Sequence, residues 1–266
     1  MTKCDALLSL HNRRLSGLNF CYKLFIIRLN KLAGFYRYSA GLVLSSRHFV
    51  TVGLRKILVV LSAHELSVVK SDRLLFDKVN FSVEPAGLVY VKGPNGAGKT
   101  SLLRVLSGLV EPEQGEVRFA DQKLAKVREQ FHHSLVYFGH KLGLNLRLSA
   151  IENLHFWCQQ QQQACDIEQL YAVLGQLQLV GLEDVPVGQL SAGQQRRVAL
   201  SRLWLKSSAR LWILDEPFTA LDQQGIQLLS AKLGAFLAAQ GSVIMTSHQE
   251  LEFDYPRQEL ALEYRI

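Results

Sequence analysis

The residues best suited to chemistry lie in one glycine-rich stretch, Gly93-Pro-Asn-Gly-Ala-Gly-Lys-Thr100. It fits the pattern G-x-x-x-x-G-K-[ST], in which successive backbone N–H groups of a tight loop point into one concavity and bind phosphate oxygens. Lys99 would place a positive charge on the β- and γ-phosphates of a nucleotide, and the Thr100 hydroxyl would ligate Mg²⁺. The residues expected to contact the nucleotide are Gly93, Pro94, Asn95, Gly96, Ala97, Gly98, Lys99, Thr100 and Ser101.

Two carboxylates follow a second informative segment, the apolar run Leu211-Trp-Ile-Leu214. Such a run predicts a buried strand, and open α/β sheets bind their ligands at the carboxyl ends of strands. We expect Asp215 to hold Mg²⁺ through water, and Glu216 to orient or deprotonate the water that attacks the γ-phosphate. The alternative is a strand that ends in a solvated acidic turn.

Two further segments place polar residues at the ends of predicted elements. Gln189–Val198 predicts a helix with Ser191 near its N-terminus, where free N–H groups and the helix dipole favour an anion. The alternative is an ordinary capped helix with a basic face. The run Ser242–Ser247 predicts a buried strand that ends at His248, although an isolated histidine is more often structural.

The elements that must position these residues follow from local patterns. Gly87–Val91 is a short apolar run before the glycine-rich loop, and leucines recur at helical spacing after it, up to Gly108. Further strands are predicted at 66–69, 79–83 and 116–119. Helices are predicted from about 142 to 195, including a capping box at Ser149 and Glu152. The glutamine run 159–163 is of low complexity and is expected to be solvated.

Together the four segments resemble the motifs of ATP-binding cassette (ABC) ATPases. Leu190-Ser-Ala-Gly-Gln194 resembles the family's signature motif, Thr219-Ala-Leu-Asp222 its D-loop, and His248 its switch histidine, which hydrogen-bonds the γ-phosphate. The resemblance implies an α/β fold: a P-loop NTPase core with a RecA-like parallel sheet, an antiparallel β subdomain and an α-helical insert at about 142–195. It also implies a homodimer of cassettes that sandwiches two ATP molecules. The residues that would contact the nucleotide of the opposing subunit, or line the dimer interface, are Leu190, Ser191, Gly193, Gln194 and Asp222.

Two positions depart from the family pattern. His140 stands where ABC ATPases have a glutamine that touches Mg²⁺, and a neutral imidazole can still accept a hydrogen bond from metal-bound water. The aromatic residue on which the family stacks adenine is absent near Lys70 to Arg73. The Arg73 guanidinium could stack on the base instead, and we expect weaker discrimination against GTP.

A narrower resemblance extends over roughly residues 62–250, to the ATP-binding subunits of the haem exporters of cytochrome c maturation. It rests on Gly139-His140, 152–156, 189–205 and 211–222. It implies an ATP hydrolase bound peripherally to the cytoplasmic face of the inner membrane, with integral membrane permease subunits of a haem-maturation complex as partners. The alternatives are the ATPase of a different transporter, a soluble ABC ATPase, and a regulatory nucleotide-binding protein without turnover.

Charge is unevenly distributed along the chain. The net charge of +7 is concentrated in residues 1–60, where ten Lys and Arg side chains accompany one acidic residue, Asp5. Residues 61–266, the expected ABC domain, sum to −2, so no general affinity for nucleic acid is expected. The basic extension 1–60 has three explanations: an over-long start, a membrane-surface segment or a targeting peptide.

The four cysteines, Cys4, Cys21, Cys158 and Cys165, form no C-x-x-C motif. We expect structural or incidental thiols in a reducing compartment.

Overall fold

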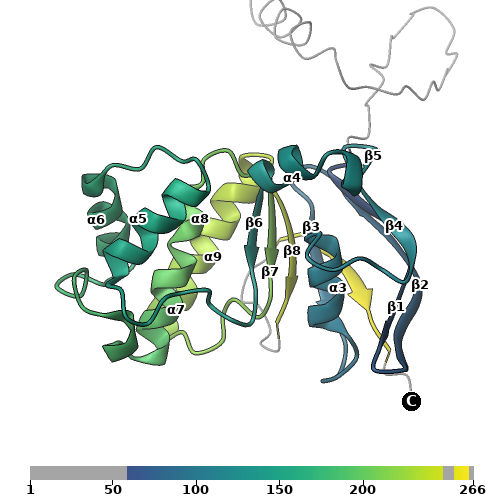
Figure 1. Cartoon of the computed structure of the whole chain (residues 1–266), viewed down its shortest axis with the longest axis horizontal. Coiled ribbons are helices and arrows are strands. Elements are labelled where there is room, and N and C mark those ends of the chain that lie inside the picture. Colours follow the sequence, from purple (N-terminus) through teal and green to yellow (C-terminus); the bar gives the residue numbers. More distant parts are fainter. Residues whose placement is uncertain (1–58, 248–254, 264–266) are drawn as a thin grey trace, which may run out of the picture. The chain divides into compact units, whose positions relative to one another are not determined.

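The computed structural model describes residues 59–247 and 255–263, which fall within one compact unit, Leu58–Ile266 (Figure 1). The predictions made for residues 1–58 and for His248 lie outside the described residues.

A parallel sheet of five strands forms the core of this unit, in the spatial order β6-β7-β8-β3-β9. Alternate residues of each central strand face opposite sides, and both sides are buried: Leu211 and Ile213 of β7 join one hydrophobic cluster, Trp212 and Leu214 another. Burial on both faces explains why these strands are apolar throughout rather than alternating. The strands are β3 (Leu88–Lys92), β6 (Leu135–Phe138), β7 (Leu211–Leu214), β8 (Ser242–Thr246) and β9 (Gln258–Ala261).

A separate antiparallel sheet has the order β2-β1-β4-β5, as expected for the β subdomain. Its first hairpin turns at Ser71 and Asp72, whose φ angles of 49° and 61° suit the tight two-residue turn that matches strand twist. The strands are longer than the apolar runs that predicted them. They are β1 (Leu61–Lys70), β2 (Arg73–Val83), β4 (Gln114–Phe119) and β5 (Gln122–Lys123).

Helices cover both faces of the parallel sheet (Figure 1). Helix α3 (Lys99–Leu106) lies between the two sheets and shares one hydrophobic cluster with both. Helices α8 (Arg202–Leu205) and α9 (Gln223–Ala238) cover the opposite face. The short helix α4 (Arg128–Ser134) precedes β6. Both faces are thus occupied, as in other α/β folds with a parallel sheet.

The predicted helical insert has its own hydrophobic cluster, built from α5 (Ala150–Gln160), α6 (Ile167–Gln176) and α7 (Ala192–Leu200). The capping box predicted at the start of α5 is confirmed, because Ser149 and Glu152 exchange side-chain and backbone hydrogen bonds. Two 3-10 turns complete the described elements, η2 (Leu124–Lys126) and η3 (Val187–Gln189). Among the described residues, the structure contains no helix with the length and apolar character needed to cross a bilayer.

Candidate nucleotide site

The glycine-rich loop joins β3 to α3 at the carboxyl edge of the parallel sheet, as its sequence predicts. Gly98 has the left-handed angles φ 93° and ψ 10° at the N-cap of α3, and a Cβ there would come within 3.1 Å of both Leu75 and Phe76. At Gly93 a Cβ would lie 2.5 Å from the carbonyl oxygen of Leu262, just after β9. Only glycine fits at either position without displacing its neighbours.

A pocket of about 230 Å³ lies against this loop. Lys99 is only 8% exposed, and its Nζ donates to the carbonyl oxygens of Gly93 at 2.6 Å and Pro94 at 3.2 Å. The loop therefore holds the ammonium group over its own concavity, which is where a phosphate would meet it. The lining residues are Lys70, Leu75, Pro94, Asn95, Gly96, Gly98, Lys99, Thr100, Ser101 and Glu216.

A continuous hydrogen-bond network joins the ends of strands β7 and β8 to the start of helix α3 behind the loop. Thr100 Oγ1 donates to Asp215 Oδ2 at 2.8 Å, and Thr246 Oγ1 donates to Asp215 Oδ1 at 2.8 Å. Asp215 is 3% exposed, and both of its carboxylate oxygens are thus engaged. The two residues predicted to hold Mg²⁺ lie in direct contact and present only oxygen atoms, the donor type that this ion prefers. The residues fit the predicted metal.

Glu216 lines the pocket beside Lys99 and Thr100. Its backbone has φ 49°, in the left-handed region that residues with a Cβ rarely adopt. The conformation is fixed from two sides, because its N–H donates to Thr246 Oγ1 at 2.9 Å and its carbonyl oxygen accepts from the Arg196 guanidinium. An uncommon backbone conformation held in this way is typical of residues that act on a ligand.

Arg196 connects the signature segment to this edge, a role that the sequence did not indicate. It is 8% exposed, contacts the backbone of Glu216 and Pro217, and its guanidinium carbon lies 5.2 Å from the centroid of the Phe138 ring. Burial lowers the pKa of Arg196, while the charges of Glu216 and Asp215 oppose that shift. The alternative for this segment was a capped helix with a basic face, and the structure buries that face at Arg196 and Arg197. A buried arginine requires such partners.

The signature segment begins α7, with Ser191 as the N-cap residue. Ser191 and Gln194 form a capping box: Ser191 Oγ accepts from the Gln194 N–H at 3.2 Å, and the Ser191 N–H donates to Gln194 Oε1 at 2.8 Å. Leu190 is buried beneath this turn, and Gly193 lies close to the D-loop, since a Cβ there would be 2.9 Å from the carbonyl oxygen of Ala220. None of these residues lines the pocket beside the glycine-rich loop.

The D-loop residue Asp222 is the N-cap of α9, where its Oδ1 accepts from the Gly225 N–H at 2.8 Å and from Arg197. These two contacts hold the pKa of the Asp222 carboxyl below its usual range. Arg197 also donates to Leu177 O at 3.1 Å, so that it joins the D-loop to the end of helix α6 in the helical insert.

Five further residues differ in how they relate to the pocket. His140 follows β6 and is exposed, and it does not line the pocket. Of the segment at the first hairpin, Lys70 lines the pocket and Arg73 does not. Leu75 also lines the pocket, although no sequence motif indicated it. Thr246 was likewise missed, although its place at the end of the predicted strand before His248 could have indicated it.

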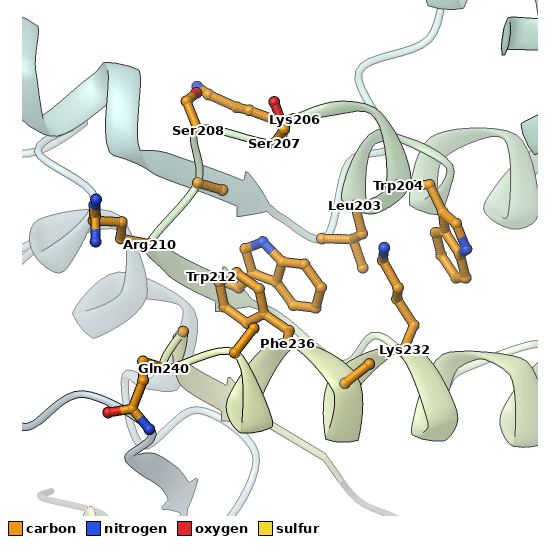
Figure 2. Close-up of a pocket in the computed structure, with 14 residues that line it drawn as sticks. Leu203, Trp204, Lys206, Ser207, Ser208, Arg210, Trp212, Lys232, Phe236 and Gln240 are labelled. Carbon is orange, nitrogen blue, oxygen red and sulfur yellow. The ribbon is translucent and has the colours of Figure 1, made fainter. Parts of the chain in front are cut away.

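A larger pocket of about 450 Å³ lies elsewhere, around the loop that precedes β7 (Figure 2). It is lined by Trp212 and Phe236, whose rings stack at 3.7 Å, and by Lys206, Ser208 and Lys232. It contains none of the residues that the motifs predict for nucleotide binding, so size alone does not identify the site.

Comparisons with known proteins agree with this geometry. The family model described as "ABC transporter" matches residues 76–219. An ABC transporter ATP-binding protein from Pyrococcus furiosus superimposes with a TM-score of 0.65 at 25% identity, covering 76% of this chain and 96% of that one. A dimeric ATP-binding cassette bound to ADP and Pi gives 0.66 at 20% identity, over 77% and 97%, and shows the fold alone.

Among curated proteins, two of the most similar are named cytochrome c biogenesis ATP-binding export protein CcmA. The one from Salmonella typhi is 50% identical over 192 residues, which is 72% of this chain and 91% of that protein. The one from Yersinia pestis bv. Antiqua (strain Nepal516) is 47% identical over 192 residues, 72% and 87%. The fold, the site and these relatives lead to one conclusion: the chain belongs to the ABC transporter family, and within it to the CcmA-type ATP-binding export proteins.

Proposed function

We propose that two copies of this chain hydrolyse ATP at two shared sites, as the peripheral ATPase of a permease complex at the cytoplasmic face of the inner membrane. The observation that carries the proposal is that the motifs of a single chain do not all lie at one pocket. The glycine-rich loop and its acidic strand end form one pocket, whereas Ser191 and Gly193 lie outside it. A second copy would bring its signature helix to the γ-phosphate.

Each residue of the pocket has a role in this scheme. Lys99 and the loop amides would hold the β- and γ-phosphates, and Thr100 and Asp215 would hold Mg²⁺. The ion, when bound, would neutralise charge that develops on the phosphate oxygens. Glu216 would orient the attacking water and accept its proton. Outside the described residues, His248 would hydrogen-bond the γ-phosphate.

The signature helix of the second copy would add an anion site. Its exposed N-terminal N–H groups and helix dipole favour negative charge. Ser191 and Gln194 satisfy one another in the single chain. The Ser191 hydroxyl would turn from the capping box toward the γ-phosphate when the two copies close.

The cellular role follows the CcmA relatives. We propose that ATP hydrolysis by this chain serves cytochrome c biogenesis, with haem, or a protein that carries haem, as the cargo of the complex. The permease subunits, which belong to other polypeptides, would make the cargo contacts. Residues 61–266 carry no net basic charge, which agrees with a role away from nucleic acid.

The test is affinity purification of the full chain from detergent-solubilised membranes, followed by mass spectrometry of the proteins that accompany it. We expect an integral permease together with haem-handling proteins. Recovery with a different permease would support the ATPase function but would mean that the complex has a different cargo. A chain found only in the soluble fraction, with no membrane protein, would contradict the transport role. The Lys99→Ala variant, purified in parallel, is the control for ATPase activity of the complex.

A further inference from the structure

Two cysteines that lie seven positions apart in the sequence touch in the helical insert. Cys158 lies in the last turn of α5, and Cys165 directly precedes Asp166, the N-cap residue of α6. Their sulfur atoms are 2.6 Å apart, and the Cys158 thiol donates to Cys165. Both are free thiols, and neither takes part in the nucleotide site. The sequence suggested structural or incidental thiols because no C-x-x-C motif is present, and the fold brings this pair together.

The two thiols have unequal surroundings. Cys158 is 1% exposed and belongs to the hydrophobic cluster of the insert, with Leu154 and Leu174. Burial, together with the neighbouring Cys165 thiol, raises the pKa of Cys158 far above its usual value. Cys165 is partly exposed. A reagent from solution would therefore meet Cys165 first, and Cys158 could react only with a group already held beside it.

The intervening glutamines form an ordered loop that keeps the pair together. The Gln163 N–H donates to Cys158 O at 2.9 Å, and the Cys165 N–H donates to Gln163 O at 3.0 Å. Gln161 Oε1 accepts from Lys206 Nζ, and Gln163 Nε2 donates to Ser208 Oγ at 3.4 Å. Lys206 and Ser208 lie on the loop at the edge of the larger pocket (Figure 2).

We propose that Cys158 and Cys165 form a reversible dithiol–disulfide site that reacts with low-molecular-weight disulfides such as oxidised glutathione. The Cys165 thiolate attacks one sulfur of the reagent, forms a mixed disulfide and releases one glutathione thiolate. Cys158 then gives its proton to the released glutathione thiolate and attacks the Cys165 sulfur, so that the protein disulfide forms and the second glutathione leaves as a thiolate, which takes up the proton that Cys165 lost. Two protein thiols are oxidised and one glutathione disulfide is reduced to two thiols.

The geometry favours closure of the bond at this position. A disulfide needs sulfurs about 2.05 Å apart, and these two already lie 2.6 Å apart. The bond would join the end of α5 to the start of α6 and restrict the unfolded chain. The same hydrophobic cluster contains Leu190 and Val198 of the signature region. We expect oxidation to stabilise the insert and raise the thermal midpoint by about 5 °C.

The test uses the full chain, incubated with oxidised glutathione, blocked with N-ethylmaleimide and digested with trypsin. Both cysteines fall in one tryptic peptide, because residues 148–195 contain no Lys or Arg. The expected result is a peptide that has lost two hydrogens and bears no maleimide, and dithiothreitol should restore two reactive thiols. The oxidised chain should also melt at a higher temperature than the reduced chain.

Two variants separate the roles of the thiols. Cys158→Ser should stop at a glutathione adduct on Cys165, and Cys165→Ser should leave Cys158 slow to react; Cys158→Ala repeats the first test if serine is poorly tolerated in the buried position. The proposal fails if the wild-type peptide still takes up two maleimides. It also fails if glutathione stays on Cys165, or if Cys165 pairs with Cys4 or Cys21.

Discussion

The glycine-rich edge and the signature helix differ in how complete they are within one chain. At the edge, Thr100, Asp215, Thr246 and Glu216 form one hydrogen-bonded network around a pocket. At the N-terminus of α7, Ser191 is exposed and exchanges hydrogen bonds with Gln194 of its own helix turn. In the proposed function, the first region would receive phosphate and metal, and the second would be an anion site for the nucleotide of the other copy.

This difference separates binding from turnover. If the glycine-rich edge suffices to hold ATP, changes there alter binding and hydrolysis, whereas changes in the signature helix affect only the step that needs two copies. Arg196 and Arg197 connect the two regions, because they extend from α7 to the backbone of Glu216 and to Asp222. These two buried arginine side chains, and not residues that bind one ligand together, join the two regions.

One of the largest effects is expected at Glu216. Glu216→Gln keeps the size of the side chain and removes the base, so steady-state ATP hydrolysis should fall on the order of a hundredfold or more. The variant should still bind ATP and accumulate as an ATP-bound dimer, measurable by light scattering. Retained turnover would show that Glu216 is not the base that accepts the proton of the attacking water.

Two substitutions that each abolish turnover should differ in binding. Lys99→Ala should lose both ATP binding and hydrolysis, because the loop lacks its cation. Ser191→Arg places a bulky side chain at the exposed start of α7 and should lose hydrolysis while each chain still binds ATP. Equilibrium binding of a fluorescent ATP analogue distinguishes them. Equal binding loss in both variants would mean that the signature helix contacts the nucleotide within its own chain.

A smaller effect is expected from the network behind the loop. Thr246→Val removes the hydroxyl that donates to Asp215 Oδ1 and accepts from the Glu216 N–H, at a cost of about 1–3 kcal/mol in the free energy of unfolding. Thr246→Ser keeps the hydroxyl and is the matched control. Urea denaturation of both variants gives the difference. Equal stabilities would show that water replaces the hydroxyl freely.

The smallest effect is expected in how Asp222 changes the free energy of unfolding at acid pH. Its pKa is lowered in the folded chain by the Gly225 N–H and Arg197, so its contribution to stability is complete above the unfolded value, about 3.9, and is lost as the pH falls through the folded value. Asp222→Asn should therefore flatten the decline of the unfolding free energy below about pH 4. An unchanged acid limb would contradict this.

Much of this site could be predicted from the sequence because its motifs are local. The glycine-rich loop, the acidic strand end and the helix caps each depend on residues within a few positions, and the structure places them as expected. Contacts between residues far apart in the sequence could not be predicted in this way. Thr246, Leu75 and the buried side of Arg196 enter the site through long-range packing, which no spacing along the chain indicates.

The elements that were missed have the same physical cause. β9 has the sequence Gln258-Glu-Leu-Ala261, half polar and short, and becomes a strand because it completes the edge of the sheet beside β3. The contact of Cys158 with Cys165 depends on the fold of a glutamine-rich loop that composition alone describes as solvated. The strand β9 and the cysteine contact thus both depend on how the chain folds, and not on local composition.

The central claim is that each ATP site is assembled from two chains, and mixed dimers test it most directly. Lys99→Ala and Ser191→Arg chains with different affinity tags are co-expressed, and only dimers with both tags are isolated. Such a dimer has one site with both defects and one site with neither. The account predicts about half of the wild-type turnover if the sites act independently, although neither homodimer is active. Mixed dimers as inactive as both homodimers would contradict it.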